Sequence, residues 1–119
     1  MNNKLMAPIK LMPLVLLLWG IDAAASDGRF IVLGEGNTTC GMYLAHRRDA
    51  GPVQNFAYAR WTQGFISGWN IMAQPGQKIR TEVSPDTILA YADKYCRDNP
   101  LDVFLNAASA LTKDLSGKR

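Results

Sequence analysis

Apolar residues recur every three or four positions in the centre of the chain. Three aromatic residues and a methionine follow this rhythm, namely Trp61, Phe65, Trp69 and Met72. Spacing of this kind places side chains on one face of a helix. The pattern predicts a long central helix from about Val53 to Ala73 that buries the aromatic face against other helices.

Two glycines, Gly64 and Gly68, lie between these aromatic residues. A glycine in a helix interior costs roughly 1 kcal/mol relative to alanine. Two glycines four residues apart are therefore unfavourable unless another backbone packs closely against them. We expect close helix packing at both positions.

Capping residues and prolines predict three further helices. The first runs from about Cys40 to Arg48, after the capping sequence Asn37-Thr38-Thr39. The third begins at Ser84-Pro85-Asp86, and a fourth begins with Asn99 as its cap and Pro100 as its first residue. The residues expected to face the core are Ile88, Leu89, Ala92, Tyr95 and Cys96 on the third helix and Leu101, Phe104, Ala108, Leu111 and Leu115 on the fourth. The predicted fold class is all-α, a small four-helix domain.

Two segments outside these helices are less regular. The apolar run from Phe30 to Leu33 fits either a short strand or an ordered arm. The segment from Lys78 to Val83 has a mixed, mostly polar sequence. It predicts a surface loop with a binding or hinge role.

The N-terminal residues have the pattern of a cleavable signal peptide. Lys4 and Lys10 precede the apolar run from Leu11 to Trp19, and small residues follow at Ala23 to Ala25. We expect cleavage after Ala25, which gives a signal peptide of residues 1–25 and a single helical domain of residues 26–119. A membrane span needs about 20 apolar residues, so no stable membrane insertion is expected, although a retained N-terminal anchor is the alternative reading. The expected localisation is the periplasm or the secreted fraction.

Only two cysteines are present, Cys40 and Cys96. An even number of cysteines in an oxidising compartment indicates one disulfide. The bond would join the start of the first helix to the end of the third, and it would stabilise the fold by about 4 kcal/mol on the chain-entropy account. A metal site needs more ligands than two isolated cysteines, so no metal or cofactor is expected.

The charge pattern argues against a nucleic-acid surface. The chain has a formal net charge of +3, and Arg47-Arg48 is the only adjacent basic pair inside it. The single histidine, His46, is expected at the surface, and no nucleophile with a base and an orienting carboxylate is apparent. We therefore expect a protein that is not an enzyme.

The aromatic content of the central helix suggests a protein partner. Trp61, Phe65 and Trp69 offer more apolar area than so small a core needs, and the surplus would form a partner-binding patch together with Arg47 and Arg48. For Trp61 and Phe65, core packing alone is the favoured explanation, whereas for Trp69 core packing and partner binding are equally supported.

Short motifs in the chain resemble two groups of small exported bacterial proteins. Cys40 with Tyr43-Leu44, Trp61-x-x-Gly64-Phe65 and the run from Tyr95 to Pro100 resemble the HdeA/HdeB family of periplasmic acid-stress chaperones. That resemblance implies a small helical protein with a single Cys40–Cys96 bridge. The stretch from Gly64 to Gly68 and the alanine-rich final helix after Asn-Pro are similar to the Tai-type immunity proteins of type VI secretion.

Two functional hypotheses follow. A chaperone would lose its carboxylate charges below about pH 4, loosen by self-repulsion and expose the Trp61 to Trp69 face to unfolded client proteins. An immunity protein would bind one specific toxin at neutral pH through Arg47, Arg48, the loop from Lys78 to Val83 and Trp69. A homodimer is compatible with either hypothesis, and a small envelope protein with neither role is the third reading.

Overall fold

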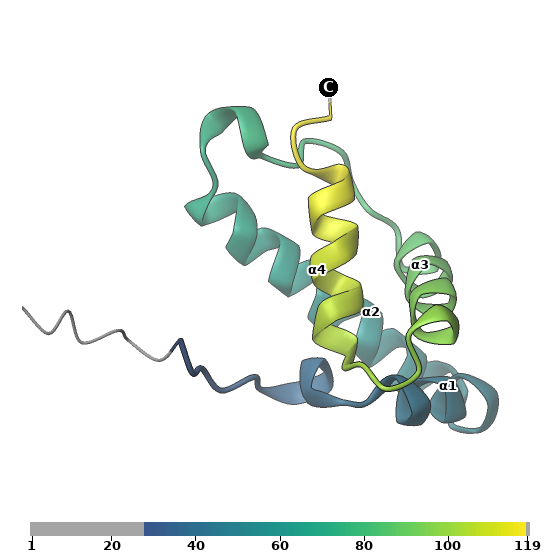
Figure 1. The fold of residues 1–119 in the computed structure, drawn as a ribbon. Coiled ribbons are helices and arrows are strands. Elements are labelled where there is room, and N and C mark those ends of the chain that lie inside the picture. Colours follow the sequence, from purple (N-terminus) through teal and green to yellow (C-terminus); the bar gives the residue numbers. More distant parts are fainter. Residues whose placement is uncertain (1–27, 119) are drawn as a thin grey trace, which may run out of the picture. The chain divides into compact units, whose positions relative to one another are not determined.

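The computed structural model describes residues 28–118, and the expected signal peptide lies outside the described residues. The chain divides into two units at Phe30, and residues 28–30 of the first unit have no regular secondary structure. The second unit contains α1 (Cys40–Asp49), α2 (Gly51–Met72), α3 (Pro85–Asp98) and α4 (Phe104–Leu115), with the short 3-10 helices η1 (Gly34–Asn37) and η2 (Pro75–Gln77) (Figure 1). The prediction of an all-α, four-helix fold is therefore confirmed.

The first two helices begin and end close to the predicted residues. The Thr39 side chain accepts a hydrogen bond from the Met42 amide at 3.2 Å and so caps the N-terminus of α1. Gly51 has a φ of +79°, in the left-handed region that favours glycine, and it allows the chain to turn sharply from α1 into α2. At the other end of α2, η2 contains Pro75 and turns the chain toward α3.

The segment 78–83 is attached to α2 and is only partly a surface loop. The Asn70 side chain donates to the Ile79 carbonyl at 2.9 Å and accepts from the Ile79 amide at 2.8 Å. Gln63 donates to the Val83 carbonyl at 3.0 Å. Ile79 and Val83 are buried, whereas Arg80 and its two following neighbours are exposed. The mixed sequence thus reflects two apolar anchors on either side of a polar tip.

The fourth helix begins at Phe104, four residues later than predicted. Asn99 does not cap it; the Asn99 side chain instead donates to the Tyr95 carbonyl at the end of α3. Val103 is extended because the chain around it pairs with the chain before α1: the Cys40 amide donates to the Asp102 carbonyl at 2.8 Å, and the Phe104 amide donates to the Thr38 carbonyl at 2.8 Å. These tertiary hydrogen bonds outweigh the local capping signal. Leu101, expected in the core, is 98% exposed.

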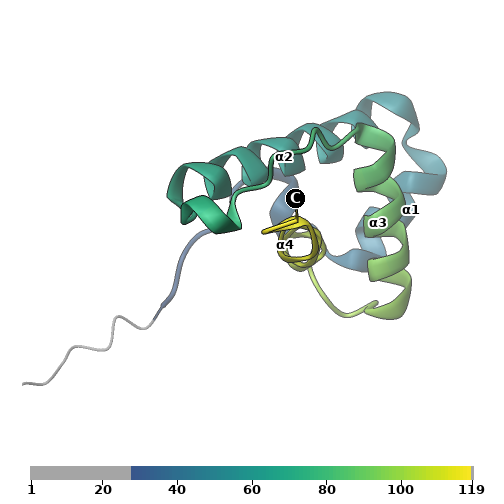
Figure 2. The same cartoon turned by 90° about the horizontal axis from the view of Figure 1, so that it is seen from above.

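Two apolar clusters form the core between the helices. The disulfide cluster contains Cys40, Tyr43, Tyr58, Ala59, Leu89, Ala92, Cys96, Phe104 and Ala107, with residues from all four α-helices. The loop cluster contains Ile66, Ile79, Val83, Ile88 and Leu111, and it draws on α2, α3, α4 and the segment 78–83. Figure 2, which looks down α4, shows α2 and α3 on either side of that helix. Within residues 28–118, no helix is both long and apolar enough to cross a membrane.

Candidate functional site

The buried face of α2 is not the predicted aromatic face. The buried residues of this helix are Tyr58, Ala59, Thr62 and Ile66. Trp61, Phe65 and Trp69 are partly buried on the flank of that face, and Met72 is 82% exposed. The helical period was predicted correctly, but the face predicted to be buried, the most apolar one, was wrong. The buried face includes a polar residue, Thr62, whose hydroxyl donates to the Tyr58 carbonyl at 3.0 Å. A threonine bonded in this way can occupy the core.

Trp61 is covered by the segment that precedes α1. Its indole N–H donates to the Leu33 carbonyl at 2.8 Å, and a Cβ placed on Gly36 would overlap its ring. The ring of Phe65 stacks on Trp61 with 5.7 Å between centroids. Residues 31–33 of the run from Phe30 to Leu33 do not form a strand. The chain that follows this run packs against α2 as an arm.

Trp69 lies apart from that pair and packs against the loop cluster. Its indole N–H points to the Gln77 carbonyl at 3.4 Å. Trp61 thus packs against the arm before α1 and against Phe104 of the disulfide cluster, whereas Trp69 packs against the loop cluster. The three aromatic side chains form a partly covered face rather than one continuous exposed patch.

The prediction of close helix packing at Gly64 and Gly68 is wrong for the described residues. Both glycines are exposed, and a Cβ added to either would meet no atom of another segment within 4 Å. Among the described glycines, the closest approach is at Gly36, in η1. Its contact is with a side chain of α2, so the close approach involves α2 but not the two glycines of that helix.

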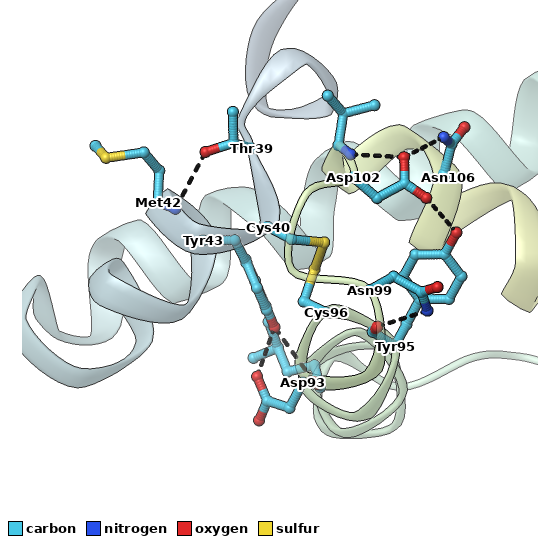
Figure 3. Close-up of a disulfide and its surroundings, with 12 residues drawn as sticks. Thr39, Cys40, Met42, Tyr43, Asp93, Tyr95, Cys96, Asn99, Asp102 and Asn106 are labelled. Carbon is cyan, nitrogen blue, oxygen red and sulfur yellow. Dashed lines mark hydrogen bonds between the residues drawn. A yellow bond between two sulfur atoms is a disulfide. The ribbon is translucent and has the colours of Figure 1, made fainter.

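A second candidate site lies beside the disulfide, where α1 meets α3. The bond between Cys40 and Cys96 places their Cα atoms 4.9 Å apart and brings Tyr43 close to Asp93 (Figure 3). The Tyr43 hydroxyl donates to Asp93 Oδ1 at 2.9 Å, and burial, followed by this hydrogen bond, raises the Tyr43 pKa. The predicted disulfide is confirmed.

Asp93 also fixes one of the two predicted arginines. Arg47 Nε donates to Asp93 Oδ1 at 2.9 Å and Arg47 Nη2 to Asp93 Oδ2 at 3.0 Å, the two-bond geometry that suits a guanidinium and a carboxylate. The hydrogen bond to Asp93 raises the Arg47 pKa. Arg47 therefore remains charged and is held in one orientation.

A hollow of about 350 Å³ opens next to this pair and is lined by Leu44, Arg47, Arg48, Asp93 and Arg97. We call it the basic hollow. Arg48 and Arg97 are exposed, and neither forms an ion pair with another residue of the range 28–118. Sequence reasoning missed Asp93 and Arg97. A usable signal was present, since a Cys40–Cys96 bond brings the helix after Cys40 against the helix around Cys96.

The immunity patch predicted from the sequence is not brought together as one surface. Arg47 and Arg48 lie on α1 and face α3, as the lining of the basic hollow shows. The segment 78–83 and Trp69 belong to the loop cluster, to which α1 contributes no residue. The basic hollow and the loop cluster are therefore separate candidate surfaces.

His46 is half-buried rather than a free surface residue. Its Nδ1 lies 2.7 Å from the Tyr58 hydroxyl, and the two rings are 6.0 Å apart. Burial raises the Tyr58 pKa. Among residues 28–118, no group of three or more His, Cys, Asp or Glu side chains is arranged to hold a metal ion.

Comparisons with protein-family models, with curated proteins and with solved structures gave no match.

Proposed function

We propose that this protein is exported, binds other proteins and acts as an acid-stress chaperone. The observation that carries the proposal is that aspartates hold α3 to its neighbours. Asp93 accepts from Tyr43 and Arg47 of α1, Asp114 of α4 accepts from Tyr91 at 2.6 Å, and Asp102 accepts from Tyr95 at 2.6 Å. Hydrogen bonds to a charged carboxylate are stronger than those to a neutral carboxylic acid, so an attachment of this kind is one that acid weakens.

Two carboxylates, one at the end of α3 and one just after it, indicate that acid lowers the stability of the fold. The hydrogen bond from Tyr95 lowers the Asp102 pKa, and the hydrogen bond from Lys94 lowers the Asp98 pKa. A carboxyl group whose folded pKa is lowered stabilises the fold above its unfolded pKa of about 3.9, and that stability is lost as the pH falls through the folded pKa. The protein is then expected to loosen below about pH 4.

Loosening of α3 would uncover partly buried aromatic side chains. Trp69 and Tyr91 pack on the loop cluster, to which α3 contributes Ile88. Trp61 and Phe65 are already partly exposed. Together these side chains offer an adaptable apolar surface to unfolded clients, while the Cys40–Cys96 bond limits how far the chain can open.

The test is light scattering of an aggregation-prone enzyme at about pH 3 and at pH 7, with and without the oxidised chain of residues 26–119. We expect suppression only in acid, accompanied by loss of near-ultraviolet circular dichroism. The variant Phe65→Ser should weaken suppression, whereas Val53→Ser, a matched change at an 85% exposed position near the start of α2, should leave it unchanged. A chain that keeps its full near-ultraviolet signal at pH 2 contradicts the mechanism.

A second function, inhibition of a periplasmic toxin, is favoured by the fixed orientation of Arg47. A charged group that is already held in place loses little conformational entropy on binding and suits a tight, specific partner at neutral pH. The test is inhibition, at a one-to-one ratio and pH 7, of an exported enzyme encoded beside this chain. Full enzyme activity in the presence of excess oxidised chain would remove this alternative.

A further inference from the structure

We propose that the basic hollow binds a carboxylate-bearing segment of a partner protein at neutral pH. This proposal rests on the second proposed function, in which the partner is a periplasmic toxin, and it adds that the partner presents carboxylate groups. It is independent of acid loosening, because the hollow belongs to the folded, disulfide-bonded protein.

The charges of the hollow leave an excess of cations. Arg47, Arg48 and Arg97 supply three guanidinium groups, and Asp93 is the one carboxylate among the described residues of the lining. Asp93 is already engaged by Arg47 and by the Tyr43 hydroxyl. It therefore offsets Arg47 and leaves the other two guanidinium groups for a ligand.

Two carboxylates lie just outside the lining, and neither forms an ion pair with Arg48 or Arg97, although the charge of Arg97 contributes to the lowered Asp98 pKa after the hydrogen bond from Lys94. Asp98 follows Arg97 in the chain, and its side chain accepts from Lys94 at 2.7 Å. Asp49 follows Arg48 but forms no ion pair with it. Arg48 and Arg97 are thus two exposed guanidinium groups on facing helices, the arrangement that a pair of carboxylates on one segment can satisfy.

The shape and chemistry of the hollow favour an acidic protein segment over a nucleic acid. Arginine forms two parallel hydrogen bonds with a carboxylate, and Leu44 adds an apolar surface for the aliphatic part of a glutamate or a neighbouring leucine. A nucleic-acid strand is bound along a stripe of cations with aromatic stacking partners. None of the described residues that line the hollow is aromatic.

The disulfide holds the two walls of the hollow together. Arg47 and Arg48 extend from α1, and Asp93 and Arg97 extend from α3, the two helices joined by Cys40 and Cys96. The bond also fixes Arg47, because it keeps Asp93 within reach of α1. Reduction is therefore expected to weaken ligand binding even when the helices remain formed.

The test uses the oxidised chain of residues 26–119 and a fluorescent twelve-residue peptide of glutamate pairs alternating with leucine pairs. Fluorescence anisotropy at pH 7 and low salt should show saturable binding that is lost with the glutamine version of the peptide. The double variant Arg48→Glu/Arg97→Glu should lower the affinity at least about tenfold. The matched double variant Lys113→Glu/Lys118→Glu makes the same charge change at exposed positions outside the lining, and it should lower the affinity less than about twofold.

Three results would overturn the proposal: equal binding of the glutamine peptide, equal losses in the two double variants, or tighter binding of a single-stranded oligonucleotide than of the acidic peptide. Near-ultraviolet circular dichroism identifies a variant that has not folded, and the milder Arg48→Gln variant then replaces it. Acid-dependent client protection is measured separately. Its presence without peptide binding would reject the basic hollow and keep the chaperone function.

Discussion

The disulfide cluster joins all four helices, whereas the loop cluster joins α2, α3 and α4 to the segment 78–83. In the disulfide cluster, the ring centroids of Tyr43, Tyr58 and Phe104 lie 4.8–4.9 Å apart. The two bonded cysteines belong to the same cluster. The loop cluster consists of aliphatic side chains, two of them supplied by the segment 78–83.

The difference shows how polar groups are distributed in a small core. Tyr43 and Tyr58 bury whole rings but keep hydroxyl partners in Asp93 and His46. In the loop cluster, the polar connections are made instead by the backbone of the segment 78–83 to Asn70 and Gln63. The buried rings of the disulfide cluster are therefore connected to polar and charged side chains. One of these, Asp93, also lines the basic hollow.

The largest difference between the clusters should appear when one central side chain of each is removed. Phe104→Ala is expected to lower the free energy of unfolding by about 3–5 kcal/mol, because a fully buried ring in contact with three others leaves a cavity. Ile79→Ala should lower it by about 2 kcal/mol, since this residue lies at the edge of its cluster. Urea unfolding of the oxidised proteins measures both, and equal losses would show that the two clusters contribute alike.

The second-largest effect is expected when the disulfide is removed. Cys40→Ala/Cys96→Ala is expected to lower the free energy of unfolding by about 2–4 kcal/mol, because the bond closes a loop with a sequence separation of 56. Hydrogen exchange should show a larger loss of protection in α1 than around Leu111 in the loop cluster. Uniform loss along the chain would indicate that the bond acts on the whole fold and not mainly on its own cluster.

The contributions of the two clusters to stability should change differently at alkaline pH, because each cluster has its own tyrosine. Burial raises the Tyr43 pKa, and burial with the Asp114 hydrogen bond raises that of Tyr91 to about 12. A raised folded pKa gives stability that is complete below the unfolded pKa of about 10 and is lost as the pH rises through the folded value.

Tyr43→Phe should therefore cost about 1–2 kcal/mol at pH 7 and less at pH 11. Tyr91→Phe, which changes an exposed hydrogen bond, should cost less than about 1 kcal/mol at pH 7. Urea unfolding at both pH values provides the comparison. A pH-independent cost for Tyr43→Phe would contradict a raised pKa at this tyrosine.

The smallest effect is expected on the exposed side of α2, a helix that contributes residues to both clusters. Gly64→Ala and Gly68→Ala should each raise the free energy of unfolding by about 0.5–1 kcal/mol, because alanine favours the helix and its Cβ meets no other segment. Thermal unfolding of the single and double variants measures this. Destabilisation would reinstate the expectation of close packing at these glycines.

Part of the candidate site was predictable and part was not. Arg47 and Arg48 stand out in the sequence as the only adjacent basic pair inside the chain, and both line the basic hollow. Arg97 and Asp93 did not stand out, because charged residues alternate along that helix. Only the packing of α3 on α1 distinguishes the carboxylate that binds Arg47 from its neighbours.

By itself, the sequence determined the helices, their approximate ends and the disulfide. Helical periodicity and the caps at Thr39 and Ser84 are local properties, and only two cysteines were available to pair. The tertiary structure decided which face of α2 is buried, where α4 begins and what surrounds Trp61. Each of these depends on contacts between distant segments: the Thr39–Val103 pairing delays α4, and the arm before α1 covers an aromatic side chain that its own helix leaves partly exposed.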